Sequence, residues 1–315
     1  MDASDDEFNH ELGCFQPELS ITTHEFSSDR RHISIGILAG RRVARKYGYS
    51  KEEAEVMRFF SRVPHPNLIQ LVDIDDGDQC LVMEGVKDGL KLYDYYNRLH
   101  RQAFTFQQAV SLLRQLASGL EYLHLLGIIH HDLNYDNVLV SLPSDATAET
   151  VTGLNVCLKI CDFGLSEMVD VEGHGSEDNR GSGTGHWRAP EQLLTDRSVP
   201  ITTKIDIFPL GLIASHLVYH GRSLAQNHFC IPLDLVDLME RCKGEHPVHR
   251  PTASQLIVEL EKTSLVNGKT MAGKIIGLVQ RALENLQAIP PELNELYTKA
   301  LAARAESLSG SDKAE

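Results

Sequence analysis

The sequence predicts an α+β protein with two lobes, a small β-rich lobe followed by a larger helical one. Short runs typical of strands fill the first part of the chain, whereas from about Phe106 the apolar residues recur with a helical period of about 3.6. The chain has 315 residues and 42% apolar content, enough for one substantial core. We expect an acidic flexible arm over 1–18, the first lobe over 19–86, the second over 87–263, and a helical extension over 264–315.

The charge balance argues against nucleic acid and membrane partners. The chain has 30 basic and 44 acidic residues and a net charge of -14, which repels phosphate-rich surfaces. It has no apolar run of the roughly 18 residues that a membrane span needs, and its acidic start does not resemble a secretory signal. We therefore expect an intracellular, cytoplasmic protein with protein partners. The six scattered cysteines are expected to be reduced thiols.

The first lobe is predicted to begin with a three-stranded meander and one helix. Strand-like runs occupy residues 19–26, 32–38 and 41–47. A helix should begin at Ser50, because Glu53 stands three residues later in the spacing of a capping box. Its buried face is predicted from apolar residues at helical intervals, namely Val56, Met57, Phe60 and Val63.

Two more strands and a long helix should follow. The runs over 67–74 and 79–86 are strand-like, and the helical period extends over 106–126. Residues 137–142 and 156–163 are predicted to pair as a hairpin with a long excursion between them.

The remaining chain is predicted to contain one loop and three helices. The Gly-rich, acidic residues over 166–185 show no periodicity and predict a mobile loop. Helical patterns then resume over 204–218, 234–242 and 252–262.

Five short motifs occur in a characteristic order. They are "HHDLNYDN", "DFG" starting at Asp162, "GTGHWRAPE" ending at Glu191, "KIDIFPLG" around Asp206 and "HRPT" around Arg250. Together they resemble the eukaryotic-type protein kinase family, whose patterns include H-R-D-L-x-x-x-N, D-F-G and A-P-E. The resemblance covers roughly residues 20–262 and implies a bilobal protein-kinase-like fold, with ATP and Mg²⁺ as the nucleotide and metal.

The resemblance also implies the roles of three polar side chains. Phosphoryl transfer requires the protein to orient a hydroxyl nucleophile and to hold metal ions against the phosphates. Asp132 fits the base, Asn137 would hold Mg²⁺, and Asp162 would hold Mg²⁺ bridging the phosphates. The alternative is that Asp132 and Asn137 only cap a loop.

Lys46 ends "VARK", which resembles the strand motif whose Lys contacts the nucleotide phosphates and pairs with a helix Glu. Glu53 is favoured as its partner over Glu55, because apolar residues follow Glu53 at the offsets of a buried helix face. The Lys-to-Glu gap of seven residues is short for the family. The alternative is that Lys46 is a surface lysine.

The resemblance further implies a nucleotide site and two structural assemblies. Ala44 and Leu139 would sandwich the adenine, while Met83, Glu84 and Val86 would offer backbone groups to its edge. Glu191 and Arg250 would form a buried ion pair in the helical lobe. An apolar spine anchored on Asp206 would consist of Met57, Leu71, His130 and Phe163.

Three departures from the family pattern are evident. Residues 24–31, where the glycine-rich phosphate cover should lie, contain no glycine, and Gly36 and Gly40 come too late. Glycine matters there because other residues keep the backbone away from phosphates. His131 replaces the Arg before the catalytic Asp, so control by phosphorylation of the following loop is not expected. Asn134 replaces a Lys.

Two classes of function are consistent with these motifs. One is an ATP-dependent protein kinase, Ser/Thr-directed because Thr184 resembles the threonine that orders the catalytic loop in those enzymes. The other is a pseudokinase that acts as a scaffold or allosteric partner. A small-molecule phosphotransferase is disfavoured by "RAPE" and the substrate-loop pattern before it. The C-terminal extension is expected to be a helical hairpin that packs in cis or binds a partner.

Overall fold

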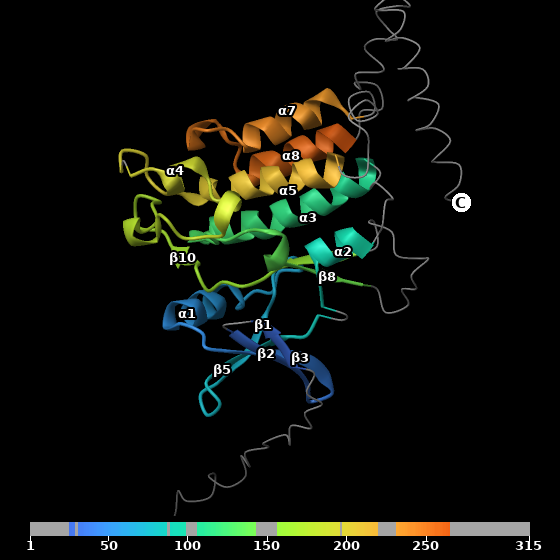
Figure 1. The fold of residues 1–315 in the computed structure, drawn as a ribbon, viewed down its shortest axis with the longest axis vertical. Coiled ribbons are helices and arrows are strands. Elements are labelled where there is room, and N and C mark those ends of the chain that lie inside the picture. Colours follow the sequence, from blue (N-terminus) through green and yellow to red (C-terminus); the bar gives the residue numbers. More distant parts are fainter. Residues whose placement is uncertain are drawn as a thin grey trace, which may run out of the picture.

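The protein has two lobes, as the sequence predicts (Figure 1). The structure is a computed structural model, and it describes residues 25–28, 31–86, 89–98, 106–142, 156–195, 197–219 and 231–264. A sheet with one helix forms the first lobe, and a group of helices forms the larger second lobe. The predicted acidic arm over 1–18 and the predicted extension from 265 onward lie outside the described residues.

The first lobe is built on a five-stranded antiparallel sheet. Its strand order is β1-β2-β3-β5-β4. The strands are β1 (Glu25–Ser28), β2 (Arg31–Leu38), β3 (Arg41–Tyr47), β4 (Leu71–Asp75) and β5 (Cys80–Glu84). The predicted meander is confirmed for the described residues from Glu25 on, and residues 19–24 of its first run are not described.

Helix α1 (Lys51–Phe60) begins where the sequence predicts but ends earlier. The Ser50 side chain accepts a hydrogen bond from the Glu53 amide at 3.1 Å, which satisfies one of the free donors of the first turn. The helix stops before Pro64, since proline cannot continue a helix. Val63 therefore lies beyond the helix, and with 63% of its surface exposed it is not part of the predicted apolar face.

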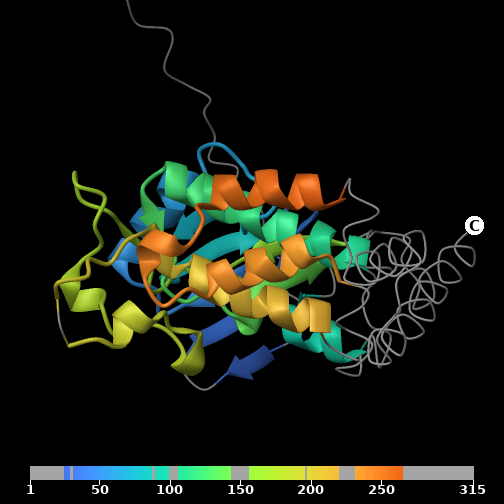
Figure 2. The ribbon, with the colours of Figure 1, turned by 90° about the horizontal axis from the view of Figure 1, so that it is seen from above.

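The second lobe packs its helices side by side. Helix α3 lies along α5 and α8, and α5 lies along α7, as both views show (Figures 1 and 2). The helices are α2 (Leu92–Arg98), α3 (Phe106–Leu125), α4 (Pro190–Leu193), α5 (Ile207–Tyr219), α7 (Leu233–Cys242) and α8 (Ala253–Ser264). One hydrophobic cluster runs from α1 through α3 to α5, α7 and α8, so the two lobes share a core. No described helix has the length and apolar character needed to cross a membrane.

Two small sheets of short strands position the loops that carry the sequence motifs. Strands β8 (Val138–Ser141) and β9 (Cys157–Ile160) form the predicted antiparallel hairpin, and β6 (Leu90–Lys91) pairs with β8. Residues 143–155 of the excursion are not described. Strand β7 (Ile128–Ile129) pairs with β10 (Glu167–Met168), which brings the segment after β9 next to the start of the "HHDLNYDN" loop.

The segment over 166–185 differs from the loop that the sequence predicts. It contains β10, a 3-10 turn at Glu177–Asn179 and several side-chain anchors. Arg180 is buried; it bonds the Glu177 carboxylate through Nε at 2.6 Å and donates to the carbonyl oxygens of Glu191 and Val199 at 2.8 Å each. These contacts fix an aperiodic segment, and hydrophobic periodicity does not report contacts of this kind.

A buried ion pair connects the end of this segment to the helical lobe. Arg250 donates to both carboxylate oxygens of Glu191 at 2.7 Å, and both residues are only 1% exposed. The remaining N–H groups of Arg250 reach the carbonyl oxygens of Gly244, Lys204 and Glu245. Complete pairing matters here because a buried charge without partners is costly.

Candidate active site

Lys46 lies buried between two carboxylates. Its ammonium group contacts Glu53 in α1 and lies 2.8 Å from Oδ1 of Asp162, and Lys46 is 3% exposed. Glu53 is also buried, whereas Glu55 is exposed, so the structure pairs Lys46 with the partner that the sequence favours. The interpretation of Lys46 as a surface lysine is wrong. A buried charge on β3 is thereby held at the junction of the two lobes.

Asp132 is held by three hydrogen bonds to its carboxylate. Oδ2 accepts from the Asn137 side chain at 2.9 Å, and Oδ1 accepts from the Asn134 side chain at 3.1 Å. Oδ1 also accepts from the backbone amide of Thr184 at 2.8 Å. Three donors on one carboxylate fix its orientation, so it is presented as a preorganised acceptor.

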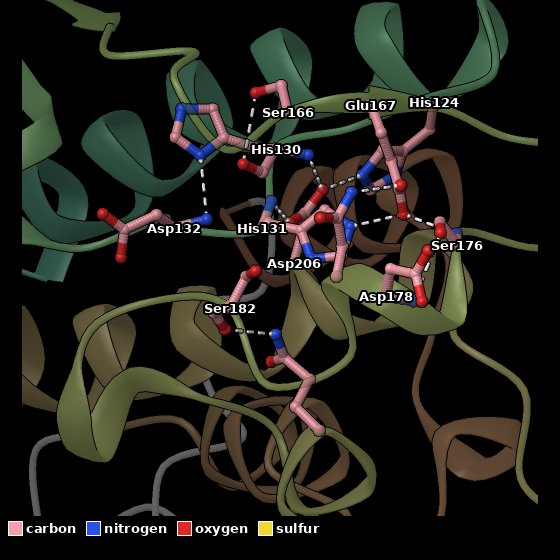
Figure 3. A network of polar contacts seen from close by, with 12 residues as sticks. His124, His130, His131, Asp132, Ser166, Glu167, Ser176, Asp178, Ser182 and Asp206 are labelled. Carbon is pink, nitrogen blue, oxygen red and sulfur yellow. Dashed lines mark hydrogen bonds and ion pairs between the residues drawn. The ribbon is translucent and has the colours of Figure 1, made fainter. Parts of the chain in front are cut away.

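Asp206 fixes the backbone that precedes Asp132 (Figure 3). Its carboxylate accepts from the amides of His130 at 2.9 Å and His131 at 3.0 Å, and His124 Nε2 lies 2.9 Å away. Burial favours the neutral acid, but the hydrogen bond and charge of His124, with the His130 contacts, outweigh it and lower the pKa of Asp206. These bonds hold His131 at φ 67°, a left-handed conformation that is uncommon for a residue with a side chain.

Aromatic stacking places Phe163 at the centre of the predicted spine. Its ring centroid lies 4.6 Å from Phe60 and 5.1 Å from His130. Met57 is buried and Leu71 is partly buried in the same hydrophobic cluster. Phe60 thus joins the four predicted residues, and the spine connects α1 to the loop before Asp132.

Four of the predicted adenine-binding residues lie on strands β3, β5 and β8, and Val86 lies just after β5. Ala44 on β3 is opposite Met83 on β5, and Leu139 is on β8. Ala44, Leu139 and Val86 are partly buried against the common core. The Glu84 side chain is committed elsewhere, since it accepts from Lys159 Nζ at 2.8 Å and from the Gln70 amide at 3.0 Å. The Glu84 amide donates to the Gln70 carbonyl at 2.9 Å, which leaves the Glu84 carbonyl as the group suited to a nucleotide.

Asn137 and Asp162 form a donor set that fits Mg²⁺. The Cys161 amide donates to the Asn137 carbonyl at 2.9 Å, which brings Asp162, the next residue, close to the Asn137 loop. Asn137 uses its amide nitrogen to bond Asp132, which leaves the side-chain oxygen as the atom suited to a metal. Within the described residues no cluster of three or more acidic, His or Cys side chains suits a metal ion. Mg²⁺ commonly binds one or two protein oxygens together with phosphates and water.

Both early glycines lie away from the turn that would cover phosphates. That turn connects Ser28 of β1 to Arg31 of β2, and its residues 29–30 are not described. Gly36 is inside β2, and Gly40, at φ 76°, is in the turn before β3. Neither Gly36 nor Gly40 therefore lies between β1 and β2.

Sequence reasoning missed two residues of the site. Asn134 was predicted only as a lost cation, but it supports the Asp132 carboxylate. Glu167 was not singled out, and it contacts His131 at 2.7 Å. An acidic residue shortly after the "DFG" motif, in a chain with His131 instead of Arg, is the signal that could have indicated this pair. Thr184 was expected to order the loop, and the contact is made by its backbone amide.

Comparisons with known proteins agree with this geometry. A family model described as the protein kinase domain matches residues 37–260. "Serine/threonine/tyrosine-protein kinase HT1" of Arabidopsis thaliana is 28% identical over 222 residues, which cover 64% of this chain and 52% of that protein. "Dual specificity protein kinase zakA" of Dictyostelium discoideum is 29% identical, covering 63% of this chain and 28% of that protein. "Serine/threonine-protein kinase tousled-like 2" of Xenopus tropicalis is 29% identical, with 64% of this chain and 29% of that protein covered. The match therefore spans about half or less of each relative.

Proposed function

This chain belongs to the protein kinase family, and we propose that it is a catalytically active kinase that transfers the γ-phosphoryl group of ATP to a Ser or Thr hydroxyl of a protein. The observation that carries the proposal is the Asp132 carboxylate, held by the Asn134 and Asn137 side chains and the Thr184 amide. A carboxylate that is oriented before the substrate arrives suits a base for a hydroxyl group.

In this proposal the acceptor hydroxyl donates its hydrogen bond to Asp132. Lys46 contacts the phosphates of the nucleotide, and Glu53 keeps the ammonium group in position from the buried side. Asn137 and Asp162 would hold Mg²⁺, which when bound neutralises charge on the phosphates. Phosphoryl transfer depends mostly on positioning and charge, and these side chains are held for both.

The nucleotide base is proposed to lie between Ala44 and Leu139. The backbone of Met83, Glu84 and Val86 would bond its edge. Met83 is 8% exposed and belongs to the common core, next to Ala44 across the strand pair.

The Ser/Thr preference is supported by two observations. Thr184 stands at the position whose threonine suggested this preference, although its contact with Asp132 is made through the backbone amide, which any residue could make. Two of the three similar proteins carry serine/threonine in their names, one of them together with tyrosine, and the third is named a dual specificity protein kinase. Protein partners, action in the cytoplasm and a helical C-terminal extension that packs in cis stay predictions from the sequence.

The test is transfer of label from γ-labelled ATP, with Mg²⁺, to the protein itself and to a generic protein acceptor. We expect Asp132→Asn to lower the rate by about a thousandfold or more, with nucleotide affinity and thermal stability nearly unchanged. Asp136→Asn is the matched control, because this exposed acidic residue in the same loop contacts only Lys91 among its described side-chain partners. Retention of most activity in Asp132→Asn would reject the catalytic role.

The glycine-free turn favours a second candidate, a pseudokinase that binds partners without transferring phosphate. Its backbone cannot approach phosphates as closely as a glycine-rich loop can. Absence of label transfer, together with thermal stabilisation by ATP that needs neither Mg²⁺ nor Asp162, would support this alternative.

A further inference from the structure

His131 and Glu167 form a buried contact between the catalytic loop and the segment that follows "DFG" (Figure 3). His131 Nε2 lies 2.7 Å from Glu167 Oε1, and the two side chains are 0% and 12% exposed. Because a carboxylate only accepts hydrogen bonds, the imidazole must donate through Nε2. Its Nδ1 is buried without a hydrogen-bond partner among the described residues. The position of His131 is therefore specified through Glu167.

Glu167 collects two further donors from its own segment. Oε1 also accepts from the Ser176 amide at 2.9 Å, and Oε2 accepts from the Asn179 side chain at 2.6 Å. Burial alone would raise the pKa of Glu167, but the hydrogen bonds from His131, Asn179 and Ser176 and the charge interaction with His131 lower it. These three donors reach both oxygens of the carboxylate. A glutamine side chain has only one acceptor oxygen, so it would not accept all three in this arrangement.

The fold leaves space for this carboxylate by placing a glycine beside it. A Cβ atom on Gly175 would lie 2.3 Å from Glu167 Oε1, well inside van der Waals contact. The Gly175 amide donates to the Ile201 carbonyl at 2.9 Å, so the backbone there is fixed. The Glu167 carboxylate therefore fits in its observed position only because residue 175 has no side chain.

The same segment returns to the catalytic loop at its other end. The Thr184 amide donates to Asp132, and a Cβ atom on Gly183 would lie 2.7 Å from the His131 carbonyl oxygen. The segment thus touches His131 from both ends, immediately before the proposed base. A change in its conformation would alter the orientation of Asp132.

A phosphate group added to this segment would find its basic side chain already bound to a carboxylate. Arg180 is the only Lys or Arg from 166 to 184, and it is buried against Glu177 and two carbonyl oxygens. The neighbouring acidic residues would repel further negative charge. The carboxylate of Glu167 supplies, within the chain, a negative group at the residue before the proposed base.

We propose that Glu167 is a positioning residue of the kinase reaction, which holds the segment over 167–184 against the catalytic loop through His131 and so keeps Asp132 oriented without an added phosphate. This inference rests on the proposed function. In this proposal the negative group that orders the catalytic loop is Glu167, which belongs to the segment itself.

The first test is a double-mutant cycle in the label-transfer assay. Glu167→Gln keeps the shape of the side chain and loses the charge, and His131→Asn removes the contact while tolerating a left-handed backbone. We expect each variant to lower kcat by about tenfold, or about 1.4 kcal/mol of barrier, with KM for ATP within about twofold. The double variant should be little worse than either single variant. Independent, additive losses, or full activity in Glu167→Gln, would overturn the proposal.

Asp178→Asn is the matched control, because it removes one carboxylate from an exposed side chain of the same segment. Its activity should equal that of the wild type. If Glu167→Gln does not fold, Gly175→Ala tests the same contact from the other side, because the added methyl group would displace the carboxylate. Wild-type kcat in a folded Gly175→Ala protein would also overturn the proposal.

Hydrogen exchange separates this inference from the proposed function. The Ser176 amide should exchange at least about tenfold faster in a Glu167→Ala variant, which removes both acceptor oxygens, than in the wild type, while amides of α3 are unchanged. This measurement does not need activity, so a wild type that transfers no label would reject the kinase proposal and leave the contact testable. Unchanged exchange at Ser176 would reject the anchoring role of Glu167.

Discussion

The two sides of the candidate active site depart from the family pattern in different ways. On the phosphate side, Lys46, Glu53 and Asp162 keep their mutual contacts, but the turn between β1 and β2 lies in a stretch without glycine. On the acceptor side, His131 replaces the Arg before Asp132. The loop is nevertheless held by hydrogen bonds with Asp206, Glu167 and Thr184.

The difference shows which losses a fold can compensate. The loss of the Arg before Asp132 can be compensated, because the residue that replaces it, His131, binds a carboxylate of another segment, that of Glu167. A missing glycine cannot be replaced in the same way, because its contribution is the absence of a side chain, which allows close backbone approach. We therefore expect the acceptor side to stay ordered without an added phosphate group. We expect nucleotide binding on the phosphate side to depend on Lys46 and the metal-binding oxygens.

Among the three tests of this comparison, the largest expected effect is on the phosphate side. Asp162→Ala should remove the thermal stabilisation by Mg²⁺-ATP, because binding to the native state stabilises by mass action, about 2.7 kcal/mol at a hundredfold excess over Kd. Thermal unfolding with and without Mg²⁺-ATP measures the effect. Glu172→Ala, which removes an exposed carboxylate from the segment that follows Asp162, should keep the full stabilisation. Stabilisation that survives Asp162→Ala would contradict this dependence.

A smaller effect is expected when the buried support of Lys46 is removed. Glu53→Gln should lower the free energy of unfolding by about 2 kcal/mol, less than for a fully broken buried pair, because Lys46 keeps its contact with Asp162. Denaturant titration measures the change. Glu55→Gln, two residues further along the same helix and exposed, should stay within about 0.5 kcal/mol of the wild type. Equal losses in the two variants would show that the Lys46 contact is not the cause.

The smallest effect is expected on the acceptor side. Ser176→Ala combined with Ser182→Ala, or treatment with phosphatase, should change the label-transfer rate by less than about twofold, or about 0.4 kcal/mol. The physical reason is that Glu167 already supplies the charge, and Arg180 is committed to Glu177. A tenfold loss that returns on rephosphorylation would show that another cation binds a phosphate there.

Several features could be predicted because they depend on residues close together in the sequence. Ser50 caps α1 at a spacing of three residues, the β8–β9 hairpin follows from two apolar runs, and Glu53 is chosen by the helical offsets that follow it. Asp132 and Asn137, five residues apart, were recognised as a pair and are hydrogen bonded. Local geometry fixes such contacts whatever the rest of the chain does.

Tertiary structure decided the contacts that join distant segments. His131 and Glu167 are 36 residues apart, Thr184 and Asp132 are 52 apart, and Asp206 lies 75 residues from His131. These contacts depend on the pairing of β7 with β10 and on the burial of Asp206, which periodicity does not encode. The sequence by itself therefore determined the α+β fold class and the polar residues of the cleft. The partners that orient those residues were decided by packing, because a hydrogen bond between distant segments requires the whole backbone to be in place.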